Sequence, residues 1–343
     1  LKVIKTSRTE IETEVIVGGR LRGQRGVNVP ESQLSISTVS DRDLSYLDFG
    51  LAHDVDWVAV SFVRSREDLE KVRSHCTAAG KNPKLMAKIE RREALVALDE
   101  IIQSSDGVMV ARGDLGVEIP VEQVPMAQKR IIALANQKGK TVVTATQMLE
   151  SMVQYPWPTR AEVADVANAV LDGTDGVMLS QETSIGLHPL ETVQIMDRVA
   201  REVEDQVKPV HVSEGQDGSS EDVSEAVVHG ACHIAEEIGA SLIVAMTRTG
   251  RTAQRFSATR PKIPIVALVP DEAIARMLIM HRGVVPLRVE HMEALEGQPE
   301  TIINLIKEAG LAQPGDRIVL TGGLPFGRAG ATRFARVLNV TGT

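Results

Sequence analysis

The sequence predicts an α/β protein built around parallel sheets, and three observations support this fold class. Short apolar runs alternate with helical patterns through most of the chain. Over the first half the runs begin roughly 23 to 35 residues apart, the spacing of strand–helix units in a (β/α) barrel. A polar stretch rich in Gly and Ser, residues 206–222, then precedes a second series of strands and reads as a linker.

Length and composition favour a small-molecule enzyme. At 343 residues the chain is long enough for about two compact units. Its hydrophobic content of 43% and charged content of 24% are typical of globular proteins. The formal net charge of -8 argues against non-specific nucleic-acid binding, which requires a basic surface.

The cysteines and the apolar runs indicate a cytoplasmic protein. Cys76 and Cys232 are far apart and in no metal-ligand spacing, so we expect neither a disulfide framework nor a zinc site. No apolar run approaches the roughly 18 residues that span a bilayer, and residues 1–6 lack a signal-peptide core. We therefore expect no membrane partner.

The N-terminal residues predict short antiparallel strands. Polar and apolar residues alternate over residues 2–5 and 14–17, with Gly18 and Gly19 as turn residues. This piece, residues 1–38, is too small to fold alone. It starts without methionine and already inside an alternating pattern, so we expect a preceding segment.

The next unit, residues 39–205, combines buried strands with capped helices. Ser65 with Asp68 and Thr159 with Glu162 form capping boxes that begin helices, and Gly80 ends the first of them. Such alternation predicts parallel strands with right-handed crossovers. The predicted strands are residues 57–62, 84–89, 107–111, 141–145 and 176–179. Because a closed (β/α)8 TIM barrel needs eight strands, either this sheet is open or three strands lie upstream.

The last unit, residues 223–343, predicts a smaller open α/β sheet. Its apolar runs are again separated by helical patterns. The predicted strands are residues 242–246, 264–269, 283–287, 317–320 and 335–338.

Charged residues follow two neighbouring strands of the barrel-like unit. Lys88 and Glu90 end one strand, and Arg112, Gly113 and Asp114 end the next. The carboxyl ends of parallel barrel strands converge on one mouth, where two carboxylates can hold Mg²⁺ or Mn²⁺. A lysine there would be a point charge on a transferring group, whereas the alternative is a structural ion pair. Gly113 permits close backbone approach, and the following N–H groups can receive an anion.

Further polar segments lie at strand ends. Thr146 sits where a strand would run into a helix, and either a mouth-facing hydroxyl or a helix N-cap explains it. Residues 160–162 and 165–170 are expected to be structural helix faces. Residues 247–252 and 321–328 follow strands of the last unit and predict phosphate-binding loops, with unremarkable glycine turns as the alternative.

Three segments resemble the pyruvate kinase family. They are Met109–Pro120, Ala145–Met152 and Pro158–Glu162, and the similarity extends over essentially the whole chain. The resemblance implies phosphoryl transfer from phosphoenolpyruvate to ADP, giving pyruvate and ATP in the last step of glycolysis. It also implies a TIM barrel with an inserted β domain and a C-terminal α/β regulatory domain, usually in a homotetramer.

The resemblance also implies roles for individual residues. Lys88 resembles the lysine that stabilises the transferring phosphoryl group, and Glu90 and Asp114 resemble the ligands of Mg²⁺ or Mn²⁺. Gly113 and Asp114 resemble the backbone site for the substrate carboxylate. Thr146 resembles the threonine over the substrate, near the face where the enolate is protonated.

Nucleotide and effector sites follow from the same resemblance. Arg25 stands where the family has a basic nucleotide contact on the inserted domain. The effector loop, which would bind a sugar phosphate or a nucleotide, corresponds to Thr247, Arg248, Thr249, Gly250, Arg251 and Thr252. A K⁺ ion is a further expected cofactor.

Three departures from the family pattern bear on these expectations. Leu1 lies inside the inserted β domain, so only five of eight barrel strands are expected, and the chain alone is expected to be inactive. Gln181 replaces a glycine, and Trp157 stands where a basic residue is usual, which affects local loop geometry. Two alternatives remain open: a metal-dependent aldolase or lyase acting on pyruvate enolate, and an inactive fragment that retains effector binding.

Overall fold

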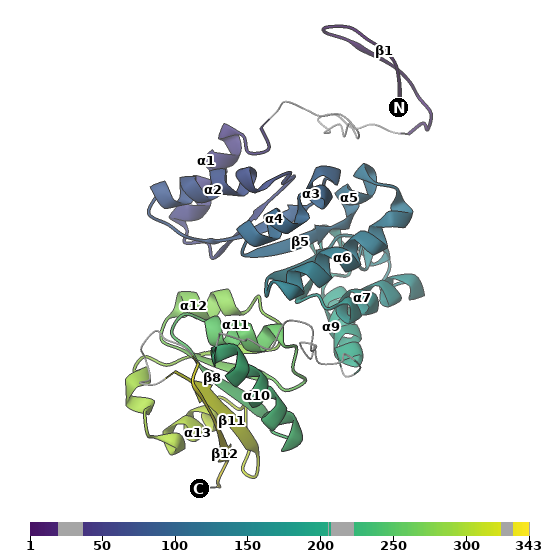
Figure 1. The fold of residues 1–343 in the computed structure, drawn as a ribbon. Helices are drawn as coiled ribbons and strands as arrows, with labels where there is room; N and C mark the ends of the chain where they lie inside the picture. The colour runs from purple at the N-terminus through teal and green to yellow at the C-terminus, as the bar shows by residue number, and fades with distance from the viewer. Residues whose placement is uncertain (20–36, 205, 207–222, 324–331, 343) are drawn as a thin grey trace. The chain divides into compact units, whose positions relative to one another are not determined.

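A computed structural model describes residues 1–19, 37–204, 206, 223–323 and 332–342 (Figure 1). By their internal contacts the residues form two units, Leu1–Ser35 and Ile36–Thr343. None of the described helices is long and apolar enough to span a membrane. The domain boundaries expected after residues 38, 205 and 222 stay predictions, and the linker lies almost wholly outside the described residues.

The N-terminal unit contains a β-hairpin. Strands β1 (Lys2–Thr6) and β2 (Ile11–Glu14) pair antiparallel, with Lys2 opposite Glu14. The turn closes through a hydrogen bond from the Ser7 N–H to the Glu10 carbonyl. The described part of this unit thus has the antiparallel strands expected from its alternating sequence.

The first sheet of the larger unit has the strand order of a barrel. Its strands are β3 (Trp57–Val60), β4 (Lys84–Ile89), β5 (Gly107–Ala111), β6 (Thr141–Ala145) and β7 (Gly176–Met178). All neighbours are parallel and follow one another in sequence, as barrel strands do. The predicted fold class, five strands of a TIM barrel, is confirmed.

Helices connect these strands, and two begin with the predicted capping boxes at Ser65 and Thr159. They are α1 (Asp41–Ala52), α2 (Arg66–Ala78), α3 (Arg92–Val96), α4 (Leu98–Ser104), α5 (Arg112–Glu118), η1 (Val121–Gln123), α6 (Val124–Gln137), η2 (Glu150–Val153), α7 (Arg160–Asp172), α8 (Gln181–Ser184) and α9 (Pro189–Glu204). Gly80, at φ 69°, follows the end of α2 and so has the left-handed conformation expected of a terminating glycine.

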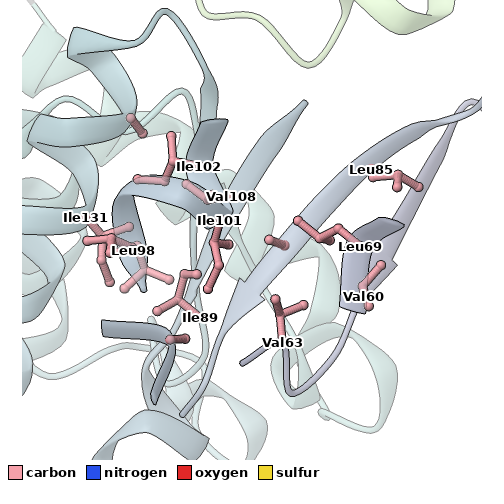
Figure 2. Packing of buried hydrophobic residues seen from close by; sticks show 14 of the residues in the cluster. Val60, Val63, Leu69, Leu85, Ile89, Leu98, Ile101, Ile102, Val108 and Ile131 are labelled. Carbon is pink, nitrogen blue, oxygen red and sulfur yellow. The ribbon is translucent and has the colours of Figure 1, made fainter. Parts of the chain in front are cut away.

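The two faces of strand β4 have different surroundings. Leu85 and Ile89 are fully buried and belong to the core beneath helices α2 and α4, which Figure 2 shows from close by with Leu69 and Ile101. Because side chains alternate along a strand, Met86 and Lys88 point to the opposite face. Lys88 thereby leaves the apolar core, and its side chain keeps 25% exposure.

The second sheet has the order β10-β9-β8-β11-β12, with apolar clusters on both faces. Its strands are β8 (Leu242–Met246), β9 (Ile265–Val269), β10 (Val284–Arg288), β11 (Arg317–Gly322) and β12 (Phe334–Asn339). Its helices are α10 (Val223–Glu237), α11 (Arg251–Ala258), α12 (Glu272–Leu278), η3 (Met292–Leu295) and α13 (Pro299–Glu308). The predicted α/β sheet is confirmed, and β12 runs antiparallel to β11.

Candidate active site

Lys88 and Glu90 form an ion pair at the carboxyl end of β4. The Lys88 Nζ atom lies 2.7 Å from Glu90 Oε1 and donates to Ser61 Oγ at 2.9 Å. Glu90 Oε2 accepts the Phe62 N–H at 2.6 Å. Strand β3 ends at Val60, two residues earlier than predicted, and Phe62 has a φ of 54°. The turn after β3 therefore holds both members of the pair.

Glu90 is buried, with 1% exposure, so the pair is not a surface contact. A buried carboxylate is costly unless it is paired and hydrogen-bonded, and Glu90 has a charged partner and a backbone donor. The ion pair that the sequence offered as the structural alternative thus exists. In this pair the Lys88 ammonium group is partly exposed and lies against the buried Glu90 carboxylate.

Ser61 was not singled out from the sequence, although it touches Lys88 directly. It follows an apolar run at a strand end, as Lys88 and Thr146 do. Strand-end position is therefore the signal that could have found it. A serine after a strand is common, however, and the contact with Lys88 spans 27 positions in sequence.

Arg112, Gly113 and Asp114 form the first turn of α5, directly after β5. The Gly113 N–H donates to Thr146 Oγ1 at 2.8 Å. A Cβ atom on Gly113 would lie 3.5 Å from that oxygen, which is an ordinary contact distance. A side chain would therefore fit here, and the notable feature of Gly113 is its backbone hydrogen bond to Thr146. The ends of β5 and β6 are thus joined at Gly113 and Thr146.

Thr146 is not a helix N-cap, so this alternative was wrong. Strand β6 ends at Ala145, and the chain reaches only the short 3-10 helix η2 at Glu150. Thr146 and Gln147 have φ values of 71° and 54°, in the left-handed region that β-branched residues rarely adopt. The predicted run of strand directly into helix is absent here because the chain makes this left-handed turn.

The helix faces expected to be structural do make structural contacts. Glu162 accepts the Ser151 N–H at 2.7 Å and caps α7 through Thr159. Burial raises the pKa of Glu162, but the hydrogen bonds from Ser151 and Thr159 outweigh burial and lower it below its usual value. Asp165 pairs with Arg112 at 2.6 Å. Gly173, at φ 97°, ends α7 with the expected turn.

A second buried carboxylate belongs to α5. Glu118 pairs with Arg91 at 3.0 Å, and both side chains are largely buried. Burial raises the pKa of Glu118 despite the opposing charge of Arg91. This pair joins the loop after β4 to the end of α5, and so braces the helix whose first turn contains Asp114.

The donor set suits a hard divalent cation that keeps several non-protein ligands. Glu90 and Asp114 follow neighbouring parallel strands, and their oxygens are the donors that Mg²⁺ and Mn²⁺ prefer. No three His, Cys, Asp or Glu side chains cluster as a metal site within the described ranges. Two carboxylates with water and substrate oxygens fit Mg²⁺, which seldom uses an all-protein cage.

The predicted effector loop follows β8 and leads into α11. Gly250, at φ 83°, is the N-cap residue of that helix. Thr252 is buried, and its hydroxyl lies 2.9 Å from that of Thr332. Arg248 and Thr249 are exposed. The loop therefore lies between a strand end and a helix start, as its sequence position indicated, and its role as an effector site stays a prediction.

Other expectations fall on residues outside or beside the site. Arg25 and most of the loop at 321–328 lie outside the described residues. Gln181 is exposed at the start of α8, and Trp157 is 70% exposed. The neighbouring Glu182 is buried and accepts the N–H groups of Leu149 and Ser180. The replacement at residue 181 is thus exposed, while its neighbour Glu182 contacts the loop after β6.

Comparisons with known proteins agree along the chain. The family "Pyruvate kinase, barrel domain" matches residues 1–193, and "Pyruvate kinase, alpha/beta domain" matches residues 225–338. A pyruvate kinase of Thermotoga maritima is 44% identical over 340 residues, covering 99% of this chain and 72% of that protein. Pyruvate kinase 2 of Synechocystis is 44% identical over 334 residues, covering 97% of this chain and 56% of that protein. A pyruvate kinase of Agrobacterium vitis is 42% identical, covering 100% of this chain and 71% of that protein.

Proposed function

Because the chain belongs to the pyruvate kinase family, we propose that the strand-end residues of its barrel sheet transfer a phosphoryl group from phosphoenolpyruvate to ADP. The products are pyruvate and ATP. The observation that carries this assignment is the buried Glu90 carboxylate, which holds the Lys88 ammonium group at the open end of β4.

Lys88 is assigned to the transferring phosphoryl group. In the reaction an oxygen of the ADP β-phosphate attacks phosphorus, and the bond from phosphorus to the enol oxygen breaks. Catalysis of such a transfer is mainly positioning and charge neutralisation. Ser61 and Glu90 hold the Lys88 side chain from two sides, which supports a fixed ammonium group as the stabilising charge.

Glu90 and Asp114 are assigned as the ligands of Mg²⁺ or Mn²⁺. Such an ion, when bound, neutralises phosphate charge and polarises substrate oxygens. Glu90 already has contacts to both oxygens, and each oxygen has a further lone pair available. The two carboxylates would hold the ion between neighbouring strand ends. K⁺ is a further proposed cofactor.

Gly113, Asp114 and Thr146 are assigned to the substrate itself. A substrate carboxylate at the backbone of Gly113 and Asp114 would compete with Thr146 for the Gly113 N–H. Thr146 is assigned to the face where the leaving enolate takes up its proton and becomes pyruvate. The link between Gly113 and Thr146 supports one pocket for both ends of the substrate.

A coupled assay tests the function. The full-length protein, given phosphoenolpyruvate, ADP and Mg²⁺, should form ATP and pyruvate in equal amounts. Absence of ATP, with pyruvate released instead by C–C cleavage of a hydroxy-oxo acid, would indicate the aldolase or lyase alternative, which no observation in the described residues favours. Loss of all turnover with intact effector binding would indicate the non-catalytic alternative.

The remaining assignments concern partners and regulation. We assign the ADP contact to Arg25, and a sugar-phosphate or nucleotide effector to residues 247–252. The N–H groups that begin α11, together with the exposed residues of the loop, support an anionic ligand there. Assembly as a homotetramer, a cytoplasmic location and inactivity of the chain alone stay predictions.

A further inference from the structure

The backbone at Thr146 is strained, so something must hold it. Two consecutive non-glycine residues, Thr146 and Gln147, occupy the left-handed region with φ 71° and 54°. Each such residue costs about 1 to 3 kcal/mol and persists only when its surroundings impose it. Met148 and Leu149, which follow, are fully buried and fix the chain on one side.

The Arg112 guanidinium group holds this turn on the other side. Its Nη2 atom donates to the Thr146 carbonyl at 2.6 Å, and its Nε atom donates to the Ala145 carbonyl at 3.4 Å. Its Nη1 atom donates to Asp165 Oδ1 at 2.6 Å. The Arg112 side chain is only 10% exposed, so the carboxylate offsets the burial of its charge.

Thr146 is therefore held at two points by adjacent residues of α5. Arg112 binds its carbonyl, and the Gly113 N–H binds its hydroxyl at 2.8 Å. The carbonyl contact sets the peptide plane, and the peptide plane sets where the side chain leaves the backbone. A shift of the guanidinium group would move the hydroxyl that is assigned to the substrate.

We propose that Arg112 is a positioning residue that sets the direction of the Thr146 hydroxyl through its backbone carbonyl, with Asp165 as the anchor of the guanidinium group. The inference rests on the proposed function, because it matters for the reaction only if Thr146 faces the enolate. We assign Arg112 no contact with the substrate. Its planar fork can bind a carbonyl and a carboxylate at once, which a single ammonium group cannot do with the same geometry.

The chain offers a matched control for Arg112. Arg73 also donates to a backbone carbonyl, that of Ser104 at 3.0 Å, and to a carboxylate, that of Asp106 at 3.1 Å. Asp106 directly precedes β5, so this arrangement lies at the N-terminal ends of the parallel strands, whereas Arg112 lies at their C-terminal ends. Arg73→Lys therefore makes the same chemical change away from the proposed site.

The experiment measures exchange of the pyruvate methyl protons with D₂O by NMR, with Mg²⁺ and ATP present, in the full-length protein. We expect Arg112→Lys to slow exchange on the order of 10²-fold, as a displaced catalytic group does. Arg73→Lys should exchange within about twofold of the unchanged protein, well below that loss. Both lysine variants should unfold in a single cooperative thermal transition, which shows that they are folded.

A double variant separates this inference from the proposed function. We expect Thr146→Val to slow exchange, and Arg112→Lys to add little further loss in the Thr146→Val background, because Arg112 acts through Thr146. Unchanged exchange in Thr146→Val would overturn the assignment of Thr146 itself. If Thr146→Val slows exchange but Arg112→Lys exchanges at the normal rate, the role of Arg112 is overturned. The same conclusion follows if the double variant shows the product of the two single rate losses. If Arg112→Lys fails to fold, Asp165→Ala removes the anchor instead and has the same expected result.

Discussion

The Nζ atom of Lys88 lies 2.7 Å from Oε1 of Glu90, and the carboxylate is buried while the lysine side chain keeps 25% exposure. The two residues are separated only by Ile89, whose side chain faces the core. Because side chains alternate along the strand, Lys88 points to the face opposite the core. Glu90, two residues later and just beyond the strand, pairs with Lys88 on that face.

Lys88→Ala should lower turnover of phosphoenolpyruvate and ADP by about 10² to 10³, because one stabiliser of the transferring charge is lost. The KM for phosphoenolpyruvate should change much less. Lys84→Ala is the control, since Lys84 lies on the same strand but pairs with Asp106. Steady-state kinetics measures both variants, and near-normal turnover in Lys88→Ala would contradict the role of Lys88.

Glu90→Gln and Asp114→Asn should each weaken binding of Mn²⁺ at least about tenfold, because even outer-shell changes cost 10- to 100-fold. Electron paramagnetic resonance of free Mn²⁺ measures this affinity without turnover. Asp99→Asn changes an exposed carboxylate that pairs with Lys138 and should leave Mn²⁺ affinity unchanged. Equal Mn²⁺ affinity in all three variants would contradict the assignment of Glu90 and Asp114 as metal ligands.

Asp106 should make the stability of the protein depend on pH. Burial raises the pKa of Asp106, but the Leu85 N–H, Lys84 and Arg73 outweigh it and lower the pKa below 3.8. The folded state therefore favours the ionised carboxylate. The stability that Asp106 contributes is complete above its ordinary pKa of 3.8 and is lost as the pH falls through its lowered pKa in the folded protein.

Asp106→Asn should accordingly destabilise the protein by about 1 to 3 kcal/mol near neutral pH, the range for hydrogen bonds to charged groups. Urea unfolding at several pH values measures the difference from the unchanged protein. The difference should shrink only below pH 3.8. A difference that shrinks as the pH rises would have the opposite sign and would refute this account.

Ile101→Ala should destabilise the barrel sheet by about 2 to 5 kcal/mol, because a fully buried side chain leaves a cavity. Ile101 is a residue of α4 and belongs to the cluster shown in Figure 2. Val96→Ala is the control, since Val96 is 85% exposed. Chemical denaturation should leave the control within about 0.5 kcal/mol of the unchanged protein, as for most surface substitutions.

Arg251→Ala should weaken binding of an anionic effector, because it removes one cation from the start of α11. Calorimetric titration with a hexose bisphosphate and with a nucleoside monophosphate would identify the ligand class and measure the loss. Arg288→Ala, at an exposed arginine paired with Glu290, is the control. Equal affinities in both variants would exclude Arg251 from the effector loop's contacts.

Local sequence patterns determined most of the fold. The strands at 84–89, 107–111, 141–145 and 242–246 have the predicted bounds, because each is an apolar run with clear polar or glycine borders. The capping boxes at Ser65 and Thr159 formed as expected, since their partners are three residues away. Lys88, Glu90 and Asp114 were found at strand ends by the same local reasoning.

Only the tertiary structure decided how the site residues are held. The left-handed turn at Thr146 has no glycine to announce it, and it depends on Arg112, 34 positions away. The Ser61 contact to Lys88 and the antiparallel direction of β12 also join distant segments. Periodicity and capping report interactions within a few residues, so the sequence by itself determined which groups reach the strand ends. The packing of separate strands decided their directions and partners.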